Sequence, residues 1–212
     1  MAARALLFDF NGTLSDDEPI LFEIWCAIFE ERGRPLTREE YFGSFAGLAD
    51  PEIAALGLGV AGEQLAAVMD ERVRRYRERV ADGACVRPEM RAAVRAAAAR
   101  VPVGVVSGAA RADIDLVLGA ARLDGVFGVV VSAEDVAAGK PDPEGYLRAA
   151  AALGVEPAGA VVLEDSEAGV HAAKAAGMRC VALLGTVAPE RLADADEVVE
   201  RVDEALVERL LG

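Results

Sequence analysis

Residues 5–14, with the sequence ALLFDFNGTL, decide the fold of this 212-residue chain. Ala5–Phe10 predicts a short strand buried on both faces, because its side chains are apolar except for Asp9. A polar turn that contains a glycine follows at once, as expected where a strand ends. An aspartate at the end of a strand is most often a helix-capping residue, so Asp9 alone indicates no chemistry.

The pattern of the first strand recurs along the chain and alternates with helical segments. Four further strands are predicted at Val101–Ser107, Gly128–Ser132, Ala158–Glu164 and Met178–Leu184. Helices are predicted at Glu89–Arg100, Ala112–Ala121, Pro143–Leu153 and Glu167–Ala176. Such alternation with short connections predicts an α/β fold, in which a Rossmann-like parallel sheet carries helices on both faces. Right-handed crossovers follow from that arrangement.

One segment between the first two strands interrupts this alternation. From residue 17 to residue 82 no run predicts a strand, and apolar residues such as Phe22, Trp25 and Phe29 recur at helical spacing. We therefore predict a catalytic core of residues 1–16 and 83–212, with an inserted all-helical cap domain of residues 17–82. The joints Ser15–Glu18 and Val80–Cys85 are expected to act as hinges.

Composition limits the partners and the compartment. The net charge of −14 argues against nucleic acid and anionic membrane surfaces, which bind basic patches. A small phosphorylated substrate is compatible with it, since a bound metal can invert the local charge. No apolar run is long enough to span a bilayer, and the one near the N-terminus is too short for a secretory signal. The isolated cysteines, Cys26, Cys85 and Cys180, indicate buried thiols in a reducing compartment. We expect a cytoplasmic monomer or weak homodimer.

Polar residues gather at the predicted carboxyl ends of the strands. Asp9 to Thr13 follow the first strand, Ser107 and Gly108 the second, Lys140 precedes a later helix, and Glu164-Asp165 end another strand. Ligands of parallel sheets bind beyond these ends, so the side chains are expected to converge. Carboxylates, a hydroxyl and an ammonium together are typical of metal-assisted phosphoryl transfer.

The proposed chemistry explains these residue types. A carboxylate can attack phosphorus and form an aspartyl phosphate, which divides a difficult hydrolysis into two steps. Two anions approach each other poorly, so Mg²⁺, which prefers oxygen ligands, is the expected cofactor. Ser107 and nearby backbone N–H groups could hold the phosphoryl oxygens, and Lys140 could neutralise their charge.

In this order and spacing the residues resemble the haloacid dehalogenase-like superfamily, in its beta-phosphoglucomutase-like and phosphatase subgroup with a helical cap. Asp9–Leu14 resembles the first motif of that superfamily, DxDGT(L), and Ser107 the second. Gly139–Pro143 is similar to the third motif, Leu163–Gly169 to the fourth, and the helical insert to the cap. The resemblance covers essentially the whole chain and implies a Mg²⁺-dependent phosphatase acting on a small phosphorylated metabolite.

The resemblance also implies a role for each site residue. Asp9 is the implied nucleophile and a Mg²⁺ ligand, together with the backbone carbonyl of Asn11 and the carboxylate of Asp165. Glu164 is implied to lie nearby, as a further ligand or behind the ligands. The implied phosphoryl-binding residues are Thr13, Ser107, Gly108 and Lys140, and the cap is implied to close over the substrate.

Asn11 is the main departure from the family. The family has an aspartate here that protonates the leaving group and then activates water. An amide cannot exchange a proton near neutral pH, and losing such a group costs about 10²- to 10⁴-fold in rate. Three interpretations stay open: an engineered trap, a natural subfamily with another acid, or a weak or non-catalytic relative. Asp16, Asp17 and Glu18 are candidate substitutes, although acids there commonly begin a helix.

Alternative activities remain to be weighed. A sugar-phosphate mutase usually offers basic cap residues, whereas Phe45–Asp50 is apolar and acidic, which favours a substrate with one phosphate. Metal-independent 2-haloacid dehalogenases do not usually carry adjacent acids such as Glu164-Asp165. No lysine precedes Lys140, which excludes the branch with a Schiff-base lysine in its cap. A non-catalytic phospho-ligand-binding relative stays open. His171 is expected at the surface or in helix packing.

Overall fold

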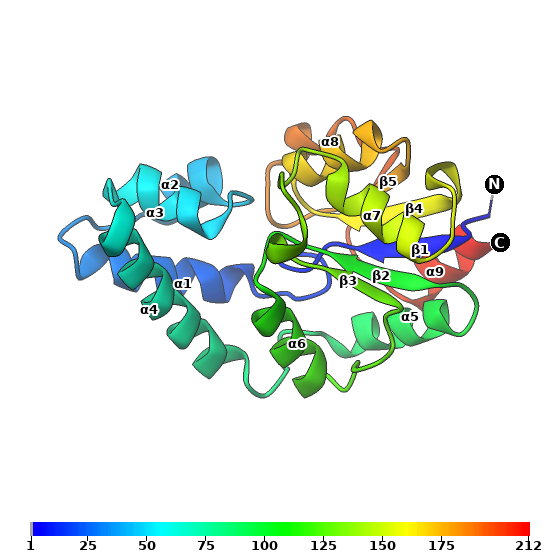
Figure 1. Ribbon diagram of the computed structural model, residues 1–212, viewed down its shortest axis with the longest axis horizontal. Helices are drawn as coiled ribbons and strands as arrows, with labels where there is room; N and C mark the ends of the chain where they lie inside the picture. The colour runs from blue at the N-terminus through cyan, green and yellow to red at the C-terminus, as the bar shows by residue number, and fades with distance from the viewer. Residues whose placement is uncertain (1) are drawn as a thin grey trace.

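The computed structural model describes residues 2–212, and its sheet confirms the predicted parallel architecture (Figure 1). Six parallel strands lie in the order β3-β2-β1-β4-β5-β6. They span Ala5–Phe8 (β1), Val103–Val106 (β2), Val129–Val131 (β3), Ala160–Glu164 (β4), Arg179–Leu183 (β5) and Glu197–Val199 (β6). Strand order reverses beside β1, since β2 and β3 lie on one side of it and β4 to β6 on the other. Such a switch point is where open α/β sheets bind ligands.

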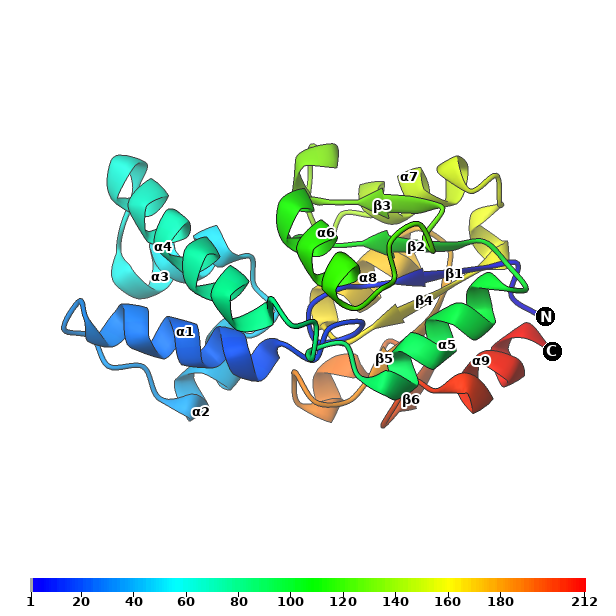
Figure 2. The same cartoon turned by 90° about the horizontal axis from the view of Figure 1, so that it is seen from below.

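Helices cover both faces of the sheet (Figures 1 and 2). One face carries α5 (Pro88–Ala98), α6 (Arg111–Ala120) and α9 (Glu204–Leu211), and the other carries α7 (Glu144–Ala152) and α8 (Glu167–Ala175). Alternate residues of β1 serve the two faces: Leu6 and Phe8 pack on the first, and Ala5 and Leu7 on the second. Both faces of β1 are therefore buried, which explains its continuous apolar sequence.

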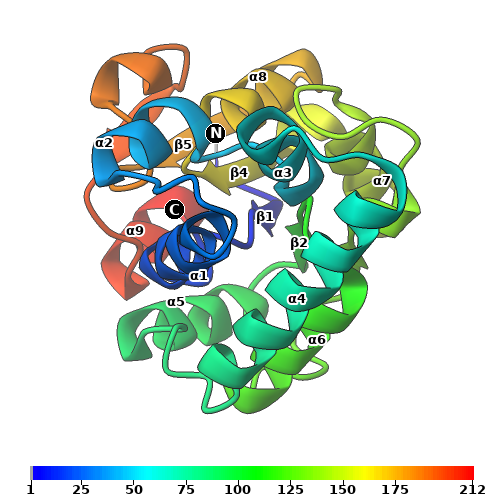
Figure 3. The same cartoon turned by 90° about the vertical axis from the view of Figure 1, so that its left-hand side faces the viewer.

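The insert between β1 and β2 is all-helical, as predicted. It comprises α1 (Glu18–Glu30), α2 (Arg38–Glu40), a π-helical turn (Tyr41–Phe45), α3 (Asp50–Leu58) and α4 (Gly62–Val80). Its apolar stripes form the interior of the cap, where the rings of Trp25 and Phe29 meet edge to face at 6.0 Å. Seen from the cap side, these helices lie in front of the sheet (Figure 3).

The two joints between the cap and the core lie side by side. The Asp16 backbone N–H donates a hydrogen bond to the Cys85 carbonyl at 2.8 Å, and the Arg87 side chain pairs with the Asp16 carboxylate. A pair of adjacent crossings suits a hinge. That hinge and the domain boundaries at residues 16–17 and 82–83 stay predictions.

Two C-terminal elements, β6 and α9, were not among the predicted ones. β6 has three residues and begins with a glutamate, so it lacks the apolar run that marked the other strands. Single 3₁₀ turns complete the structure at Ala133–Asp135, Pro157–Gly159 and Pro189–Leu192. Within residues 2–212 no helix has the length and apolar character needed to cross a membrane.

Candidate active site

Asp9 directly follows β1, and the loop after it bends back toward β4. The Asp9 backbone N–H continues the ladder to the Leu163 carbonyl at 2.9 Å, which fixes the start of the loop. Gly12 has a φ of +76°, and a Cβ on it would lie 1.9 Å from Oδ2 of Asp165. Only glycine therefore allows the loop to approach Asp165 so closely. The Thr13 hydroxyl, one residue later, donates to Oδ1 of Asp165 at 3.1 Å.

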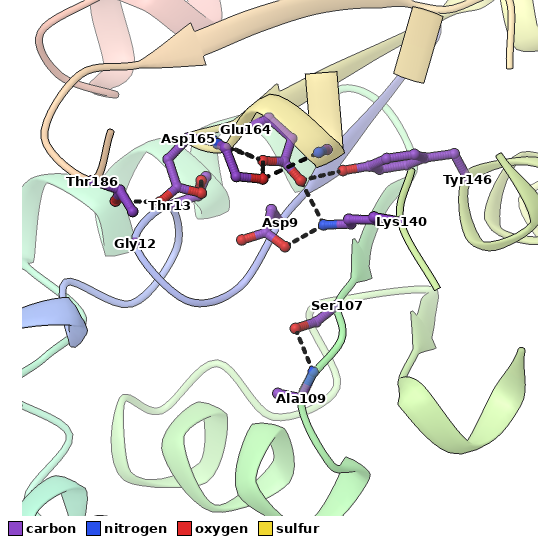
Figure 4. Close-up of polar contacts among 12 residues, drawn as sticks. Asp9, Gly12, Thr13, Ser107, Ala109, Lys140, Tyr146, Glu164, Asp165 and Thr186 are labelled. Atoms are coloured by element: carbon purple, nitrogen blue, oxygen red, sulfur yellow. Dashed lines mark hydrogen bonds and ion pairs between the residues drawn. The ribbon is translucent and has the colours of Figure 1, made fainter. Parts of the chain in front are cut away.

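Lys140 connects the ends of β1 and β4 (Figure 4). It lies in the loop before α7, and its Nζ donates to Oδ1 of Asp9 and, at 2.5 Å, to Oε1 of Glu164. Its ammonium is largely buried between the two carboxylates. Asp9, Lys140 and Glu164, three of the residues that were predicted to converge, therefore lie together.

Glu164 is fully buried, and both of its oxygens are already occupied. Oε1 accepts from Lys140 and, at 2.9 Å, from the Tyr146 hydroxyl. Oε2 accepts from the backbone N–H groups of Asp165 and Ser166 and from the Ser166 hydroxyl, at 2.8 to 3.0 Å. A carboxylate offers about four lone-pair sites, so five donors leave little capacity for a metal. Gly169 allows this packing, since a Cβ there would lie 1.7 Å from Oε1.

Asp165 is held by hydroxyl groups from two different loops. Besides Thr13, the Thr186 hydroxyl donates to its carboxylate, and the Asp165 residue is 3% exposed. Thr186 lies beyond β5 and was not among the predicted site residues. A signal was available, because Thr186 is a polar residue at the carboxyl end of a parallel strand, like the residues that were selected.

The carboxylates of Asp9, Glu164 and Asp165 form a compact cluster. Each offers one oxygen that lies within 4.8 Å of the others. Three carboxylates face the single ammonium of Lys140, so the ionised cluster keeps an excess of two negative charges. Oxygen donors with that charge fit a divalent cation such as Mg²⁺.

The pKa values follow from burial and mutual repulsion. Burial raises the pKa of Asp9 to about 7, with Lys140 opposing and the charge of Glu164 adding to the shift. Burial, followed by the charges of Asp9 and Glu164, raises the pKa of Asp165 well above its usual range. Burial also acts to raise the pKa of Glu164, but the Lys140 ammonium holds it below its usual value. The cluster therefore resists carrying three charges unless more positive charge is bound.

Ser107 and Gly108 follow β2 at the same edge of the sheet. The Ser107 hydroxyl oxygen accepts a hydrogen bond from the Ala109 backbone N–H at 3.0 Å. Figure 4 shows Ser107 set apart from the carboxylate cluster, and Gly108 is exposed. The second strand thus brings a hydroxyl to the same edge without direct contact with the cluster among the described residues.

Asn11 and the three neighbouring acids have partners of their own. The Asn11 side-chain amide donates to Oδ2 of Asp17 at 2.8 Å and has no hydrogen bond to the cluster within residues 2–212. Asp16 pairs with Arg87, and Glu18 accepts from the Tyr41 hydroxyl at 2.8 Å. None of these acids contacts the carboxylate cluster through a hydrogen bond in the described part of the chain.

The remaining candidates lie away from this site. Cys85 and Cys180 are buried and Cys26 is partly buried, in keeping with structural thiols. His171 is exposed on α8, where its Nε2 lies 3.0 Å from the Asp194 carboxylate. The surface role expected for His171 agrees with this position.

Open space beside the cluster lies between the cap and the core. One cavity of about 170 Å³ is lined by Gly12 and Thr186 of the core and by Phe42 of the cap. A second, of about 160 Å³, lies between Ala46–Leu48 of the cap and Ser166–Ala168 of the core. Both cavities are lined by residues that contact the carboxylate cluster, Thr186 in the first and Ser166 in the second.

Comparison with known proteins agrees with the geometry of the site. The sequence model of the haloacid dehalogenase-like hydrolases matches residues 3–177. The validoxylamine A 7′-phosphate phosphatase of Streptomyces hygroscopicus subsp. limoneus is 36% identical over 211 residues, or 95% of each chain. The phosphorylated carbohydrates phosphatase of Thermotoga maritima is 30% identical over 185 residues, or 82% of each chain.

A solved structure with the same fold extends the comparison. An aspartate-to-asparagine variant of CbbY from Rhodobacter sphaeroides, in complex with xylulose 1,5-bisphosphate, superposes with a TM-score of 0.81. It is 29% identical to this chain, and the match covers 95% of each chain. The resemblance inferred from the motifs is confirmed, and the chain belongs to the haloacid dehalogenase-like hydrolase family of enzymes.

Proposed function

We propose that this chain is a Mg²⁺-dependent phosphatase that hydrolyses a small phosphorylated metabolite through an aspartyl phosphate (an acyl phosphate) formed on Asp9. The chain is a phosphoric monoester hydrolase by its family and relatives. The observation that carries the mechanism is the position of Asp9, beside both Lys140 and the carboxylate cluster at the switch point of the sheet.

Several residues of the chain contribute to the first step, the transfer of the phosphoryl group. A carboxylate oxygen of Asp9 attacks phosphorus and the alcohol oxygen of the substrate leaves, so that the phosphoryl group is transferred to Asp9. Lys140 neutralises charge on the phosphoryl oxygens, and the Ser107 hydroxyl and the Thr13 backbone N–H donate hydrogen bonds to them, since the Thr13 hydroxyl donates to Asp165. A bound Mg²⁺, held by Asp9, Asp165 and the Asn11 backbone carbonyl, would reduce the repulsion between the two anions.

Glu164 has a supporting part in this proposal. Because five donors already occupy its oxygens, we assign it to the orientation of Lys140, which it contacts at 2.5 Å. Its negative charge also keeps the Lys140 ammonium protonated, since burial alone would lower the pKa of Lys140 and the carboxylates raise it. Of the two roles that were open for Glu164, we therefore propose the one behind the ligands, and Asp9 and Asp165 remain the proposed carboxylate ligands of the metal.

Asn11 slows both half-reactions. The leaving alcohol receives no proton from an amide, and water attacking the phosphorylated Asp9 finds no base in Asn11. The CbbY variant with an aspartate-to-asparagine change holds a sugar bisphosphate, which supports the idea that such an amide is compatible with a bound phosphorylated ligand.

The substrate class is inferred from the relatives and the cap. Two relatives are named as phosphatases of validoxylamine A 7′-phosphate and of phosphorylated carbohydrates, and the second name favours a phosphorylated carbohydrate as the substrate. The cap loop Phe45–Asp50 offers no base for a second phosphate, and its acid Asp50 is paired with Arg72 at 2.8 Å. The absence of a base in this loop favours a single phosphate, whereas Arg38 of the cap lines the first cavity, so bisphosphates belong in the test. The proposal includes a cytoplasmic location and a monomer or weak homodimer.

Steady-state hydrolysis of alkyl phosphates tests the proposal. With Mg²⁺ and a panel of sugar phosphates and bisphosphates, Asn11→Asp should raise turnover by about 10² or more, or roughly 2.7 kcal/mol of transition-state stabilisation. Asp9→Asn in either background serves as the control and should abolish turnover. A fast enzyme that gains nothing from the aspartate would show that another residue supplies the proton. Absence of turnover in both forms would favour a non-catalytic binding protein.

A further inference from the structure

Asp17 makes an unusual set of contacts at the first joint. Its residue is fully buried, and its carboxylate accepts from the Asn11 amide at 2.8 Å, from the Gly12 backbone N–H at 3.3 Å and from the Tyr76 hydroxyl. Two of these donors belong to the loop that carries Asp9, and the third belongs to the cap helix α4. One carboxylate thus joins the catalytic loop to the cap.

Tyr76 is itself fixed by the seating of the cap on the core. It is fully buried, and the Arg72 guanidinium lies 4.6 Å from the centre of its ring. Arg72 pairs with Asp50 of the cap at 2.8 Å and with Asp113 of core helix α6 at 3.2 Å. The position of the Tyr76 hydroxyl therefore depends on how α4 lies against α6.

The hydrogen bond to Asp17 also sets the orientation of the Asn11 side-chain amide. The Asp17 carboxyl oxygens accept hydrogen bonds from three donors, so the NH₂ group of Asn11 faces Asp17 and its carbonyl oxygen faces elsewhere. Turning the amide over would place two acceptors against each other and lose the hydrogen bond. Since the donor and acceptor ends differ, the amide presents one defined polar group to the rest of the site.

We propose that Asp17 is the positioning residue of Asn11, and that Tyr76 makes this positioning depend on the seating of the cap. Asp17 acts through Asn11 and not as a proton donor to the substrate, because it is fully buried behind three donors. Only the kinetic consequence rests on the proposed phosphatase function. The orientation of the amide can be observed without any turnover.

The composition of the chain provides a direct spectroscopic probe. Asn11 is the only asparagine and Gln64 the only glutamine, so the side-chain NH₂ region of an amide nitrogen–proton NMR spectrum should contain one pair of signals from each. Tyr76→Phe removes the hydroxyl but keeps the buried ring. We expect the Asn11 pair to shift or broaden in Tyr76→Phe, while the Gln64 pair stays in place.

Tyr41→Phe is the matched control. Tyr41 is another buried cap tyrosine, and its hydroxyl donates to Glu18, the residue next to Asp17. This control should leave the Asn11 pair unchanged. An Asn11 pair that does not respond to Tyr76→Phe, or that responds equally to Tyr41→Phe, overturns the proposal. Asp17→Ala, which removes the acceptor without adding a second side-chain amide, should perturb the Asn11 pair at least as much as Tyr76→Phe.

A double-mutant cycle tests the kinetic consequence with an activated aryl phosphate and Mg²⁺. In the Asn11→Asp background, where residue 11 can exchange a proton, Tyr76→Phe should lower kcat by about 3- to 10-fold with little change in KM, the effect expected for one hydrogen bond. In the original chain the same change should have little effect on kcat, because the Asn11 amide transfers no proton. An equal loss in both backgrounds overturns the coupling. If no form turns over, the proposed function fails, while the NMR result still decides the positioning.

Discussion

Asp165 shows how hydroxyl groups prepare a single carboxylate for a metal. Thr13 and Thr186 approach it from the loops after β1 and β5 and donate to its two oxygens. Such partners orient a ligand and leave its remaining lone pairs directed toward the ion. The pKa of Asp165 is raised first by burial and then by Asp9 and Glu164, so the carboxylate gains most from a bound cation.

Calorimetry of Mg²⁺ binding tests both the proposed ligand Asp165 and the Thr186 hydroxyl that orients it. Asp165→Ala should abolish binding, because it removes a proposed ligand. Thr186→Val should weaken binding by about 10-fold or more, since it removes only the orienting hydroxyl. The control Asp194→Ala, which deletes an exposed carboxylate beside His171, should bind Mg²⁺ like the original chain. Unchanged binding in Asp165→Ala would contradict the site.

At the scale of residues, the sequence predicted the charged side chains of the site but not the residues that hydrogen-bond to them. Asp9, Glu164 and Asp165 stand at strand ends that a parallel sheet brings together, and Lys140 precedes a helix, so position together with the resemblance to the family motifs selected them. Tyr146 was not selected, because a tyrosine inside a predicted helix has the pattern of a core residue. Its hydrogen bond to Glu164 depends on how α7 packs on the sheet.

At the scale of elements, helix α1 begins with acids that face inward. The sequence predicted that Asp17 and Glu18 would start a helix, and α1 does begin at Glu18. Asp17 makes no side-chain capping hydrogen bond, however, since its carboxylate is occupied by Asn11, Gly12 and Tyr76. The carboxylates of Asp17 and Glu18 therefore contact the loop that carries Asp9 and the cap, and their interaction with the helix dipole is secondary.

Glu18 makes the stability of the cap sensitive to pH. Burial raises its pKa to about 7, opposed by the Tyr41 hydroxyl that donates to it. At low pH the carboxyl is protonated in both the folded and the unfolded chain, so its burial costs little. Between the usual pKa of 4.5 and the folded-state pKa of about 7 only the unfolded chain ionises Glu18, so the original chain loses stability relative to Glu18→Gln as the pH rises through this window.

Denaturant unfolding of both forms measures this effect. The stability of Glu18→Gln relative to the original chain should increase by about 3 kcal/mol between about pH 4 and about pH 8. The comparison cancels groups that titrate alike in both forms. A difference that stays constant with pH would show that Glu18 ionises as an ordinary exposed glutamate does.

Prediction at the scale of elements succeeded where apolar runs were long enough. The five strands and four core helices that were predicted all appear, although β1 ends at Phe8, two residues earlier than expected. α9 was missed even though Leu206, Val207, Leu210 and Leu211 repeat at helical spacing and are buried. A closer search for that spacing near the C-terminus would have found α9.

At the scale of the whole molecule, the cap is docked on the core by a buried acid. Both oxygens of Asp113 on α6 face arginines of α4, Arg72 at 3.2 Å and Arg77 at 2.8 Å. The partners lie 41 and 36 residues apart in the chain. No local pattern marks pairs so distant, which is why the insert could be predicted but its docking could not.

Small-angle scattering tests the role of this contact in cap closure. Asp113→Asn weakens both ion pairs, so without ligand the variant should have a larger radius of gyration than the original chain. A phosphate analogue with Mg²⁺ should bring the two closer together by closing the cap. Asp115→Asn, an exposed position on the same helix, is the control. Equal dimensions of Asp113→Asn and the original chain without ligand would contradict this role.

The central claim is that Asp9 accepts a phosphoryl group. Transfer from a donor with a good leaving group needs little acid help, whereas attack of water on the product needs the base that Asn11 cannot supply. Intact mass followed by peptide mapping, after mixing the chain with acetyl phosphate and Mg²⁺, measures this most directly. The account predicts one added phosphoryl group on Asp9, slow to decay, faster to decay in Asn11→Asp and absent in Asp9→Asn. No adduct in any form, or an adduct that persists in Asp9→Asn, would contradict it.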